Sequence, residues 1–396
     1  MTPQNPVFIP GPTNIPDVLR KACDMPTMEH RSPAFGDILH PALDGARKVM
    51  KAENSEIFVF PASGTGGWET AVANTLNPGD RVLAARNGMF SHKWIKLCRD
   101  FGLEVVQIDV PWGEGLPVDA FEETLRADTG GTIKAVLATH NETATGVVSD
   151  VAGVRRALDA AKHGALLMVD GVSSIGSMDF RFDEWAIDVA VTGSQKGFML
   201  PPGLAIIAFS EKAIRASKSA ALPRGFFSID DMRAGYEANA YPYTPSVGLM
   251  NGLKESSTLL LDEGLDNVFA RHARIAEGVR RAVFAWGLQP CAATPDLYSN
   301  SVTAIRTPEG FDAASIVSHA ATHYGIAYGG GLGDVAGKVF RIGHLGLMSE
   351  AMALSGIAVA EMCMRDLGLD IPAGAGVAAA QSVYSRAPTD MKVAAE

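Results

Sequence analysis

The chain has 396 residues, enough for two domains or for one large domain with an appendage. Hydrophobic residues make up 47% of it and charged residues 20%, which supports a sizeable core and excludes global disorder. The formal net charge of −10 argues against a nucleic-acid-binding protein, because such proteins normally carry a basic face.

The first sixteen residues are rich in proline, which favours extended backbone and removes hydrogen-bond donors. We therefore expect residues 1–16 to form an N-terminal arm rather than a packed element. Near residue 255 the alternation of short apolar runs with helical stretches gives way to long helical patterns. This change predicts a large domain over 17–255 and a smaller C-terminal domain over 256–396.

Seven short apolar runs predict the strands of the large domain. Most are continuous rather than alternating, which is typical of strands buried on both faces of a parallel sheet. Helical stretches lie between them, as at 68–75, 91–101 and 151–162. The alternation predicts an α/β fold with a mostly parallel seven-stranded sheet covered by helices. The runs are 57–60, 81–85, 104–109, 134–139, 165–170, 188–193 and 204–209.

The C-terminal part mixes long helical patterns with two strand-like runs, which predicts a smaller α+β domain. The expected helices are 265–286, 313–324 and 349–367, and the expected strands are 301–306 and 338–343. The tail beyond Pro372 is rich in Ala and Gly, and we expect its end to be loosely ordered.

Ligands of such sheets bind beyond the carboxyl ends of the strands, so the residues that follow each strand are the candidates for chemistry. The first strand runs into SGTGGWE (63–69), where small residues open a helix. Free N–H groups at a helix N-terminus attract phosphate, and the Ser63 and Thr65 hydroxyls can add donors. The segment is neither a P-loop nor a GxGxxG motif. A tight turn with a capping residue explains it equally well.

Asp170 and Lys196 follow two later strands. Asp170 ends the run ALLMVD (165–170), where it is either a turn residue or a carboxylate that pairs with a cationic ring nitrogen. Lys196 lies in VTGSQKGF (191–198), and a surface lysine after a turn is the ordinary explanation. The apolar residues after it, however, would desolvate the amine, lower its pKa and suit it to Schiff-base chemistry.

A phosphate-type turn, an acidic residue and a lysine thus follow three strands in order. Pyridoxal phosphate needs these three parts: a phosphate cradle, an acid for the pyridine nitrogen and a lysine for its aldehyde. Arg341 lies in the strand-like run KVFRIG (338–343), where it offers a planar fork for a carboxylate or is an edge-strand arginine that reaches water. Arg31 is a loop arginine with a weaker claim. His140 and His344 lack a second ligand at helical spacing, so we expect no metal site.

Eight ordered motifs resemble the class V, fold-type I pyridoxal-phosphate aminotransferases, and most closely the serine–glyoxylate branch. The resemblance covers nearly the whole chain and implies a homodimer. The motifs are PGPTNIP (10–16), HRSPAF (30–35), SGTGGWE (63–69), THNETATG (139–146), VDGVSSIG (169–176), TGSQK (192–196), YPYTPS (241–246) and KVFRIGHLG (338–346).

The resemblance assigns roles residue by residue. Lys196 is implied as the lysine that forms the Schiff base and then moves the Cα proton, and Asp170 as the partner of the ring nitrogen. The remaining implied cofactor residues are Ser63, Gly64, Thr65 and Gln195 at the phosphate, Phe90 and Val172 against the ring, Thr143 near its hydroxyl, and Tyr241 and Thr244 at the phosphate of the other subunit. Arg341 and the backbone near Gly11 are implied to bind substrate, and Phe90 departs from the tryptophan of many relatives.

The reaction implied is transfer of an amino group from L-serine or L-aspartate to glyoxylate, giving glycine and hydroxypyruvate or oxaloacetate. Aspartate requires a second cation, for which Arg31 is the only candidate. The alternatives are an alanine–glyoxylate aminotransferase, a class V lyase or desulfurase, and a non-catalytic protein on the same kind of sheet. A desulfurase needs a cysteine on a mobile loop, and neither Cys291 nor Cys363 has that context.

The location is expected to be cytoplasmic. The four cysteines show no CxxC spacing, which fits a reducing compartment. The first twelve residues lack the basic and apolar regions of a signal peptide, and no apolar run is long enough to cross a membrane.

Overall fold

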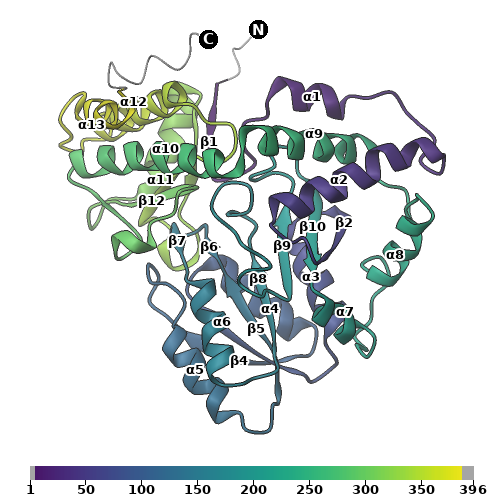
Figure 1. Cartoon of the computed structure of the whole chain (residues 1–396). Coiled ribbons are helices and arrows are strands. Elements are labelled where there is room, and N and C mark those ends of the chain that lie inside the picture. Colours follow the sequence, from purple (N-terminus) through teal and green to yellow (C-terminus); the bar gives the residue numbers. More distant parts are fainter. Residues whose placement is uncertain (1–4, 386–396) are drawn as a thin grey trace.

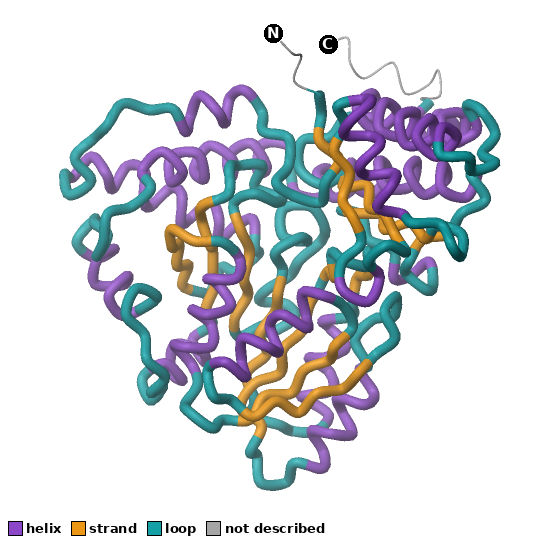
Figure 2. Tube along the Cα trace, turned by 180° about the vertical axis from the view of Figure 1, so that it is seen from behind, coloured by secondary structure: helices purple, strands orange, loops and turns teal. Residues whose placement is uncertain are grey.

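Two sheets organise the chain in the computed structural model, which describes residues 5–385. The larger sheet lies in the lower and central part of Figure 1, and the smaller one lies near the two ends of the chain. Helices flank the larger sheet, and the opposite view in Figure 2 shows further helices in front of its strands. The predicted α/β class is confirmed.

The larger sheet has seven strands in the order β2–β10–β9–β8–β5–β3–β4. Each corresponds to one of the seven predicted runs, and all neighbouring pairs are parallel except those that β10 makes with β2 and β9. The prediction of a mostly parallel sheet is therefore confirmed. Its strands are β2 (Glu56–Ala62), β3 (Arg81–Arg86), β4 (Glu104–Asp109), β5 (Ile133–Thr139), β8 (Leu166–Asp170), β9 (Val189–Gly193) and β10 (Gly203–Phe209).

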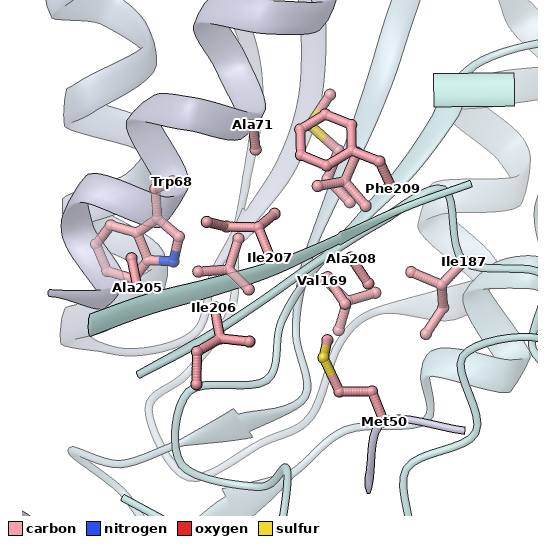
Figure 3. Close-up of a cluster of buried hydrophobic side chains, with 14 of the residues drawn as sticks. Met50, Trp68, Ala71, Val169, Ile187, Ala205, Ile206, Ile207, Ala208 and Phe209 are labelled. Atoms are coloured by element: carbon pink, nitrogen blue, oxygen red, sulfur yellow. The ribbon is translucent and has the colours of Figure 1, made fainter. Parts of the chain in front are cut away.

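The centre of this sheet is buried because its strands are apolar along their whole length. Figure 3 shows Trp68 and Ala71 of α3 (Gly64–Thr75) beside Ala205 and Ile207 of β10. Close approach of α3 to the sheet depends on Gly67, since a Cβ there would lie 2.4 Å from Val191 Cγ1. The other helices of this region are α4 (Met89–Asp100), α5 (Val118–Ala127), α6 (Val151–Ala160) and α7 (Glu211–Ser217).

The smaller sheet has the order β1–β13–β14–β12–β11 and its own buried cluster of apolar side chains. Its strands are β1 (Val7–Phe8), β11 (Gln289–Pro290), β12 (Val302–Arg306), β13 (Ala327–Gly330) and β14 (Val339–Gly343). Three helices accompany it, α10 (Leu265–Ala285), α11 (Ala313–His319) and α12 (Glu350–Asp366), and a π-helical turn extends α11 to Tyr324. The two strands and three helices expected here are present.

The N-terminal arm is packed, so the expectation of an unpacked segment is wrong at Val7 and Phe8. These two residues pair in parallel with β13, and Phe8 is fully buried beside Tyr328. The Asn14 side chain bonds both the N–H and the carbonyl of Val7, which folds the arm back on itself. The prolines therefore favour an extended arm, and its burial results from tertiary contacts with β13.

The helix α13 (Ala375–Tyr384) was not predicted from the sequence. It packs along α10, and the Glu361 carboxylate on α12 accepts hydrogen bonds from the N–H groups of Gly374 and Gly376 at its start. The Tyr384 hydroxyl donates to the Ile275 carbonyl at 2.7 Å. The expectation of a loose tail end concerns residues outside the described range.

Four further helices complete the described chain, namely α1 (Asp17–Cys23), α2 (Gly36–Val49), α8 (Ile229–Glu237) and α9 (Val247–Glu263). Helix α9 packs against both α1 and α2. The predicted domain boundary at residue 255 falls inside α9, and the division into domains stays a prediction. Within residues 5–385, no helix is long and apolar enough to cross a membrane.

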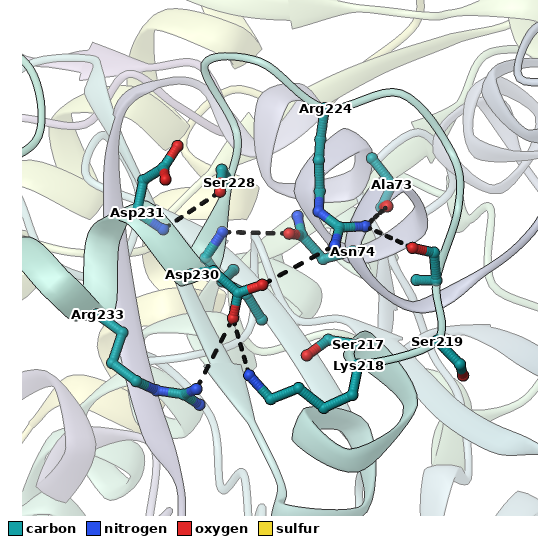
Figure 4. Close-up of polar contacts among 12 residues, drawn as sticks. Ala73, Asn74, Ser217, Lys218, Ser219, Arg224, Ser228, Asp230, Asp231 and Arg233 are labelled. Atoms are coloured by element: carbon teal, nitrogen blue, oxygen red, sulfur yellow. Dashed lines mark hydrogen bonds and ion pairs between the residues drawn. The ribbon is translucent and has the colours of Figure 1, made fainter.

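A polar cluster fixes the segment between α7 and α8 to the end of α3. Asn74 donates to the Phe227 carbonyl at 2.6 Å and accepts from the Ile229 N–H at 3.1 Å. The Asp230 carboxylate bonds Lys218 and lies near two arginines (Figure 4). This segment carries the exposed ring of Phe226, which stacks on Tyr243.

Contact between α13 and α10 makes a stability prediction. A Cβ on Gly278 would lie 2.2 Å from Tyr384 Cζ, so Gly278→Ala must displace that ring and should cost about 1–3 kcal/mol. The measurement is the midpoint of urea unfolding. Gly164→Ala is the matched control, because no atom lies within 4 Å of its added Cβ. Equal midpoints for the two variants would contradict the packing of α13 on α10.

Candidate active site

Five parallel strands end at the same edge of the larger sheet, and the candidate residues follow them. Asp170 is the last residue of β8, and the segments after β2, β3, β5 and β9 carry Ser63, Phe90, Thr143 and Lys196 respectively. Contacts join these segments: a Cβ on Gly64 would lie 2.6 Å from Val172 Cγ2, and the Thr143 hydroxyl bonds the Ser173 hydroxyl at 2.7 Å. The order predicted along the sequence is therefore also a cluster in space.

Lys196 is buried beneath the N-terminal arm and is 8% exposed. Its ammonium donates to the Pro10 carbonyl, and the Thr13 hydroxyl donates to the Lys196 carbonyl at 3.4 Å. Gly11 crosses directly over the side chain with φ +106°, and a Cβ there would lie 2.6 Å from Nζ. Burial, helped by the positive charge of Arg341 and opposed by the charge of Asp170, lowers the pKa of Lys196 to about 8.

Asp170 is a buried carboxylate, 4% exposed. Within the described chain it accepts one hydrogen bond, from the Val172 N–H at 2.9 Å. The pKa of Asp170 is raised to about 7, mainly by burial and further by the negative charge of Glu142. The hydrogen bond from Val172 and the positive charge of Lys196 act in the opposite direction. A carboxylate in this state gains from a cationic N–H partner, because an incompletely paired buried charge is costly.

The turn that opens α3 has free polar groups. Ser63 is the residue before the helix, yet its hydroxyl makes no capping hydrogen bond. Ser63 and Thr65 are exposed while Gly64 is buried, so the hydroxyls face outward from a fixed backbone. The first N–H groups of any helix lack intrahelical partners, which makes this turn a site for an anion. Gln195 Oε1 is buried and has no hydrogen-bond partner among the described residues.

The predicted edge-strand alternative for Arg341 is wrong, because β14 lies between β13 and β12 and the side chain is only 7% exposed. Its Nε donates to the Gly330 carbonyl at 2.9 Å and its Nη1 to the Thr143 carbonyl at 3.0 Å. Burial lowers the pKa of Arg341 to about 10, and the charge of Glu142 opposes this shift. The guanidinium thus joins the smaller sheet to the cluster of strand ends.

His344 is a structural hydrogen-bonding residue, whereas the buried Nδ1 of His140 has no hydrogen-bond partner among the described residues. The His140 ring packs against Phe180 and Trp185, with centroids 5.6 and 5.4 Å away. His344 bonds the Thr303 hydroxyl at 2.9 Å and the Asn300 carbonyl at 3.1 Å, which fixes the loop after Arg341.

Sequence reasoning missed Glu142, a fully buried carboxylate in the strand β6 (Asn141–Glu142), which pairs with β7 (Val147–Val148). It accepts hydrogen bonds from the backbone N–H groups of Phe90, Ser91 and Ala144. The available signal was a charged residue just after a buried strand, inside THNETATG, where a carboxylate needs a partner.

Three predicted residues lie away from this cluster. The Tyr241 ring is buried, and its hydroxyl donates to the Val59 carbonyl at 2.5 Å within the same chain; its assignment to the phosphate of another subunit stays a prediction. Thr244 is exposed. Arg31 is also exposed, and its side-chain nitrogens make no hydrogen bond or ion pair to residues 5–385.

The cysteines do not offer a reactive thiolate. Burial raises the pKa of all four thiols, to about 12 for Cys98 and about 11 for Cys363. A desulfurase requires an activated cysteine near the cofactor, so these thiols argue against that alternative.

Comparison with known proteins agrees with this geometry. The family model described as aminotransferase class-V matches residues 21–334. The chain is 68% identical to the L-aspartate–glyoxylate aminotransferase of Paracoccus denitrificans over 97% of both chains. It is 51% identical to the serine–glyoxylate aminotransferase of Hyphomicrobium methylovorum, over 98% of this chain and 96% of that protein.

Among solved structures, the pyridoxamine–pyruvate aminotransferase of Mesorhizobium loti superposes with a TM-score of 0.89 at 30% identity, over 96% of this chain and 97% of that one. Because the family model spans most of the chain and the curated relatives match it almost end to end, the protein belongs to the class-V aminotransferases, enzymes whose cofactor is pyridoxal phosphate.

Proposed function

We propose that the enzyme transfers the amino group of L-aspartate to glyoxylate, giving oxaloacetate and glycine, with L-serine as the second candidate donor. The observation that carries this proposal is the 68% identity to an L-aspartate–glyoxylate aminotransferase over 97% of each chain. Serine stays a candidate because three relatives named serine–glyoxylate aminotransferase match at 44–51% identity.

The polar groups of the cluster fit pyridoxal phosphate. Asp170 has one hydrogen bond and is free to hold the ring nitrogen protonated, and the open turn after β2 is free to hold the phosphate. When bound, the cofactor supplies a cationic ring that accepts the electron pair left at Cα. The other proposed contacts are Gly64, Thr65 and Gln195 with Ser63 at the phosphate, Phe90 and Val172 on the ring, and Thr143 at its hydroxyl.

Arg341 and Lys196 act on the substrate in this proposal. The buried guanidinium of Arg341 holds the α-carboxylate of the donor, because its planar fork matches a carboxylate. Lys196 Nζ takes the proton from the donor's Cα and later returns one to the carbon that becomes Cα of glycine. A pKa of about 8 suits both steps, since the amine can be neutral or charged near neutral pH.

A homodimer is part of the proposal. The Ser63 and Thr65 hydroxyls are exposed within one chain, which leaves the phosphate turn open on one side. Thr244 is exposed as well and is proposed to close that turn in the partner subunit. Phe226 is 42% exposed, an apolar surface that an interface would bury. A cytoplasmic location is also proposed, and the four free cysteines support it.

Lys196→Ala tests the proposed function directly. The variant loses the amine that binds the cofactor and moves the Cα proton, so transamination of aspartate or serine with glyoxylate should fall by more than about a thousandfold. The wild type should also show a visible absorption band from the bound cofactor. Reduction with borohydride should link the cofactor permanently to the peptide that contains Lys196. Wild-type turnover in Lys196→Ala would contradict the assignment.

Asp170 predicts how the stability of the cofactor-free enzyme depends on pH. The pKa of Asp170 is about 7 in the folded chain and near its ordinary value of 3.8 when unfolded, so between these values the folded state binds the extra proton. Stability should therefore fall as pH rises through this window, by about 2 kcal/mol from pH ~5.5 to ~7.5, and level off above it.

The measurement is urea unfolding of the cofactor-free wild type and of Asp170→Asn at both pH values. The other titrating groups are present in both proteins, so the difference between their pH slopes belongs to Asp170 and to its coupling with Lys196 and Glu142. The variant should lack this loss and should bind pyridoxal phosphate more weakly. Parallel pH profiles would refute the shift.

Arg31 is proposed as the second cation for aspartate, supplied across the dimer interface. Arg31→Ala should lower kcat/KM for aspartate by about tenfold or more, because a charge-assisted bond to the side-chain carboxylate is lost, and should leave serine unchanged. Steady-state kinetics with both donors at saturating glyoxylate decide this. Equal effects on the two donors would remove Arg31 from the substrate site.

A further inference from the structure

Glu142 is a fully buried charge among the strand ends to which the proposed mechanism gives no part. Its Oε2 accepts from the Phe90 N–H at 3.0 Å and from the Ser91 N–H at 3.1 Å. Its Oε1 accepts from the Ala144 N–H at 3.0 Å and from the Phe90 N–H at 3.3 Å. Three backbone donors, two at the start of α4 and one in the turn that follows Glu142, thus converge on one carboxylate.

Two of these donors form the start of α4 (Met89–Asp100), where Phe90 is in the first turn. The free N–H groups and the partial positive charge of a helix start favour a carboxylate there. The approach is close, since a Cβ on Gly88 would lie 2.2 Å from Glu142 Cγ. The Ser91 hydroxyl caps the helix locally by accepting from the Gly88 N–H at 3.0 Å, and Glu142 binds the next two N–H groups, those of Phe90 and Ser91. Glu142 therefore fixes the backbone from which the Phe90 side chain projects.

The other side of Glu142 leads to the substrate arginine. Thr143 follows it directly, and the Thr143 carbonyl accepts from Arg341 Nη1 at 3.0 Å. The Thr143 hydroxyl bonds the Ser173 hydroxyl at 2.7 Å, in the segment after Asp170. The strand β6 and the residue that follows it therefore carry contacts to α4, to β14 and to the segment after β8.

We propose that Glu142 is a positioning residue that holds the Phe90 ring against the cofactor by fixing the N-terminus of α4. This inference rests on the proposed role of Phe90 and extends it to a residue that does not touch the cofactor. A carboxylate is required because both of its oxygens accept hydrogen bonds. The amide of glutamine has a single acceptor, and its NH₂ would face a backbone donor.

A double-mutant cycle on cofactor binding tests the proposal. Cofactor-free wild type, Glu142→Gln, Phe90→Ala and the double variant are titrated with pyridoxal phosphate, and the visible band gives the dissociation constant. Phe90→Ala should weaken binding about three- to tenfold through the lost stacking. Glu142→Gln should weaken it by a similar factor, and the double variant should be no weaker than Phe90→Ala alone.

Independent effects, in which the two factors multiply in the double variant, would overturn the proposal. So would wild-type affinity in Glu142→Gln. If Glu142→Gln does not fold, Glu142→Asp replaces it, since aspartate keeps the charge on a shorter side chain. This variant should show the same coupling with Phe90→Ala and a smaller loss of cofactor affinity.

Glu361→Gln is the matched control, because Glu361 is also a buried carboxylate at a helix start but serves α13 in the smaller core. It should lower the unfolding midpoint and leave the dissociation constant unchanged, which separates positioning from loss of stability. A wild type without a saturable band would refute the proposed function as well. A wild type that binds while Phe90→Ala has no effect would refute only the stacking role and this inference.

Discussion

The site depends on the burial of four charged side chains among strand ends where water is largely excluded. Lys196, Asp170, Arg341 and Glu142 are each less than a tenth exposed, and each affects the pKa of at least one other. Buried charges at close range are costly unless they are paired or hydrogen-bonded. Among the described residues, Glu142 has three backbone N–H donors and Arg341 donates to two carbonyls, whereas Asp170 has one N–H donor and Lys196 has a single carbonyl. The two groups with fewest partners are those proposed to bind the cofactor. In the cofactor-free enzyme their buried charges are therefore incompletely paired, and binding of the cofactor would stabilise them.

The parallel sheet is what makes this arrangement possible. In parallel strands every carboxyl end points to the same edge, so residues far apart in sequence arrive together without any strand having to bend. The antiparallel β10 does not disturb this, because it starts at that edge and directly follows the Lys196 loop. Gly67 allows α3 to pack closely on the sheet, which brings the turn proposed to bind phosphate to the sheet.

The sequence was sufficient for the features that depend on local pattern. The seven strands were predicted because each is a continuous apolar run, and Asp170 and Lys196 because each breaks such a run at its end. Burial of Phe8 and Tyr241 could not be predicted, since it depends on partners far away in sequence, β13 for Phe8 and the Val59 carbonyl, 182 residues away, for Tyr241. Glu142 was missed for the same reason, because two of its three donors belong to a helix more than fifty residues earlier.

The N-terminal arm links the smaller sheet to the lysine. Val7 and Phe8 pair with β13, and three residues later the chain passes over Lys196. Pro10 also lies against Gly329, where an added Cβ would be 2.9 Å from Pro10 Cδ and 3.2 Å from the Arg341 side chain. Any shift of β13 and β14 relative to the larger sheet therefore moves the arm and Arg341 together. Arg341 also bonds the Thr143 carbonyl. The guanidinium proposed to bind substrate, the arm over Lys196 and the strand that bears Glu142 therefore form one connected unit.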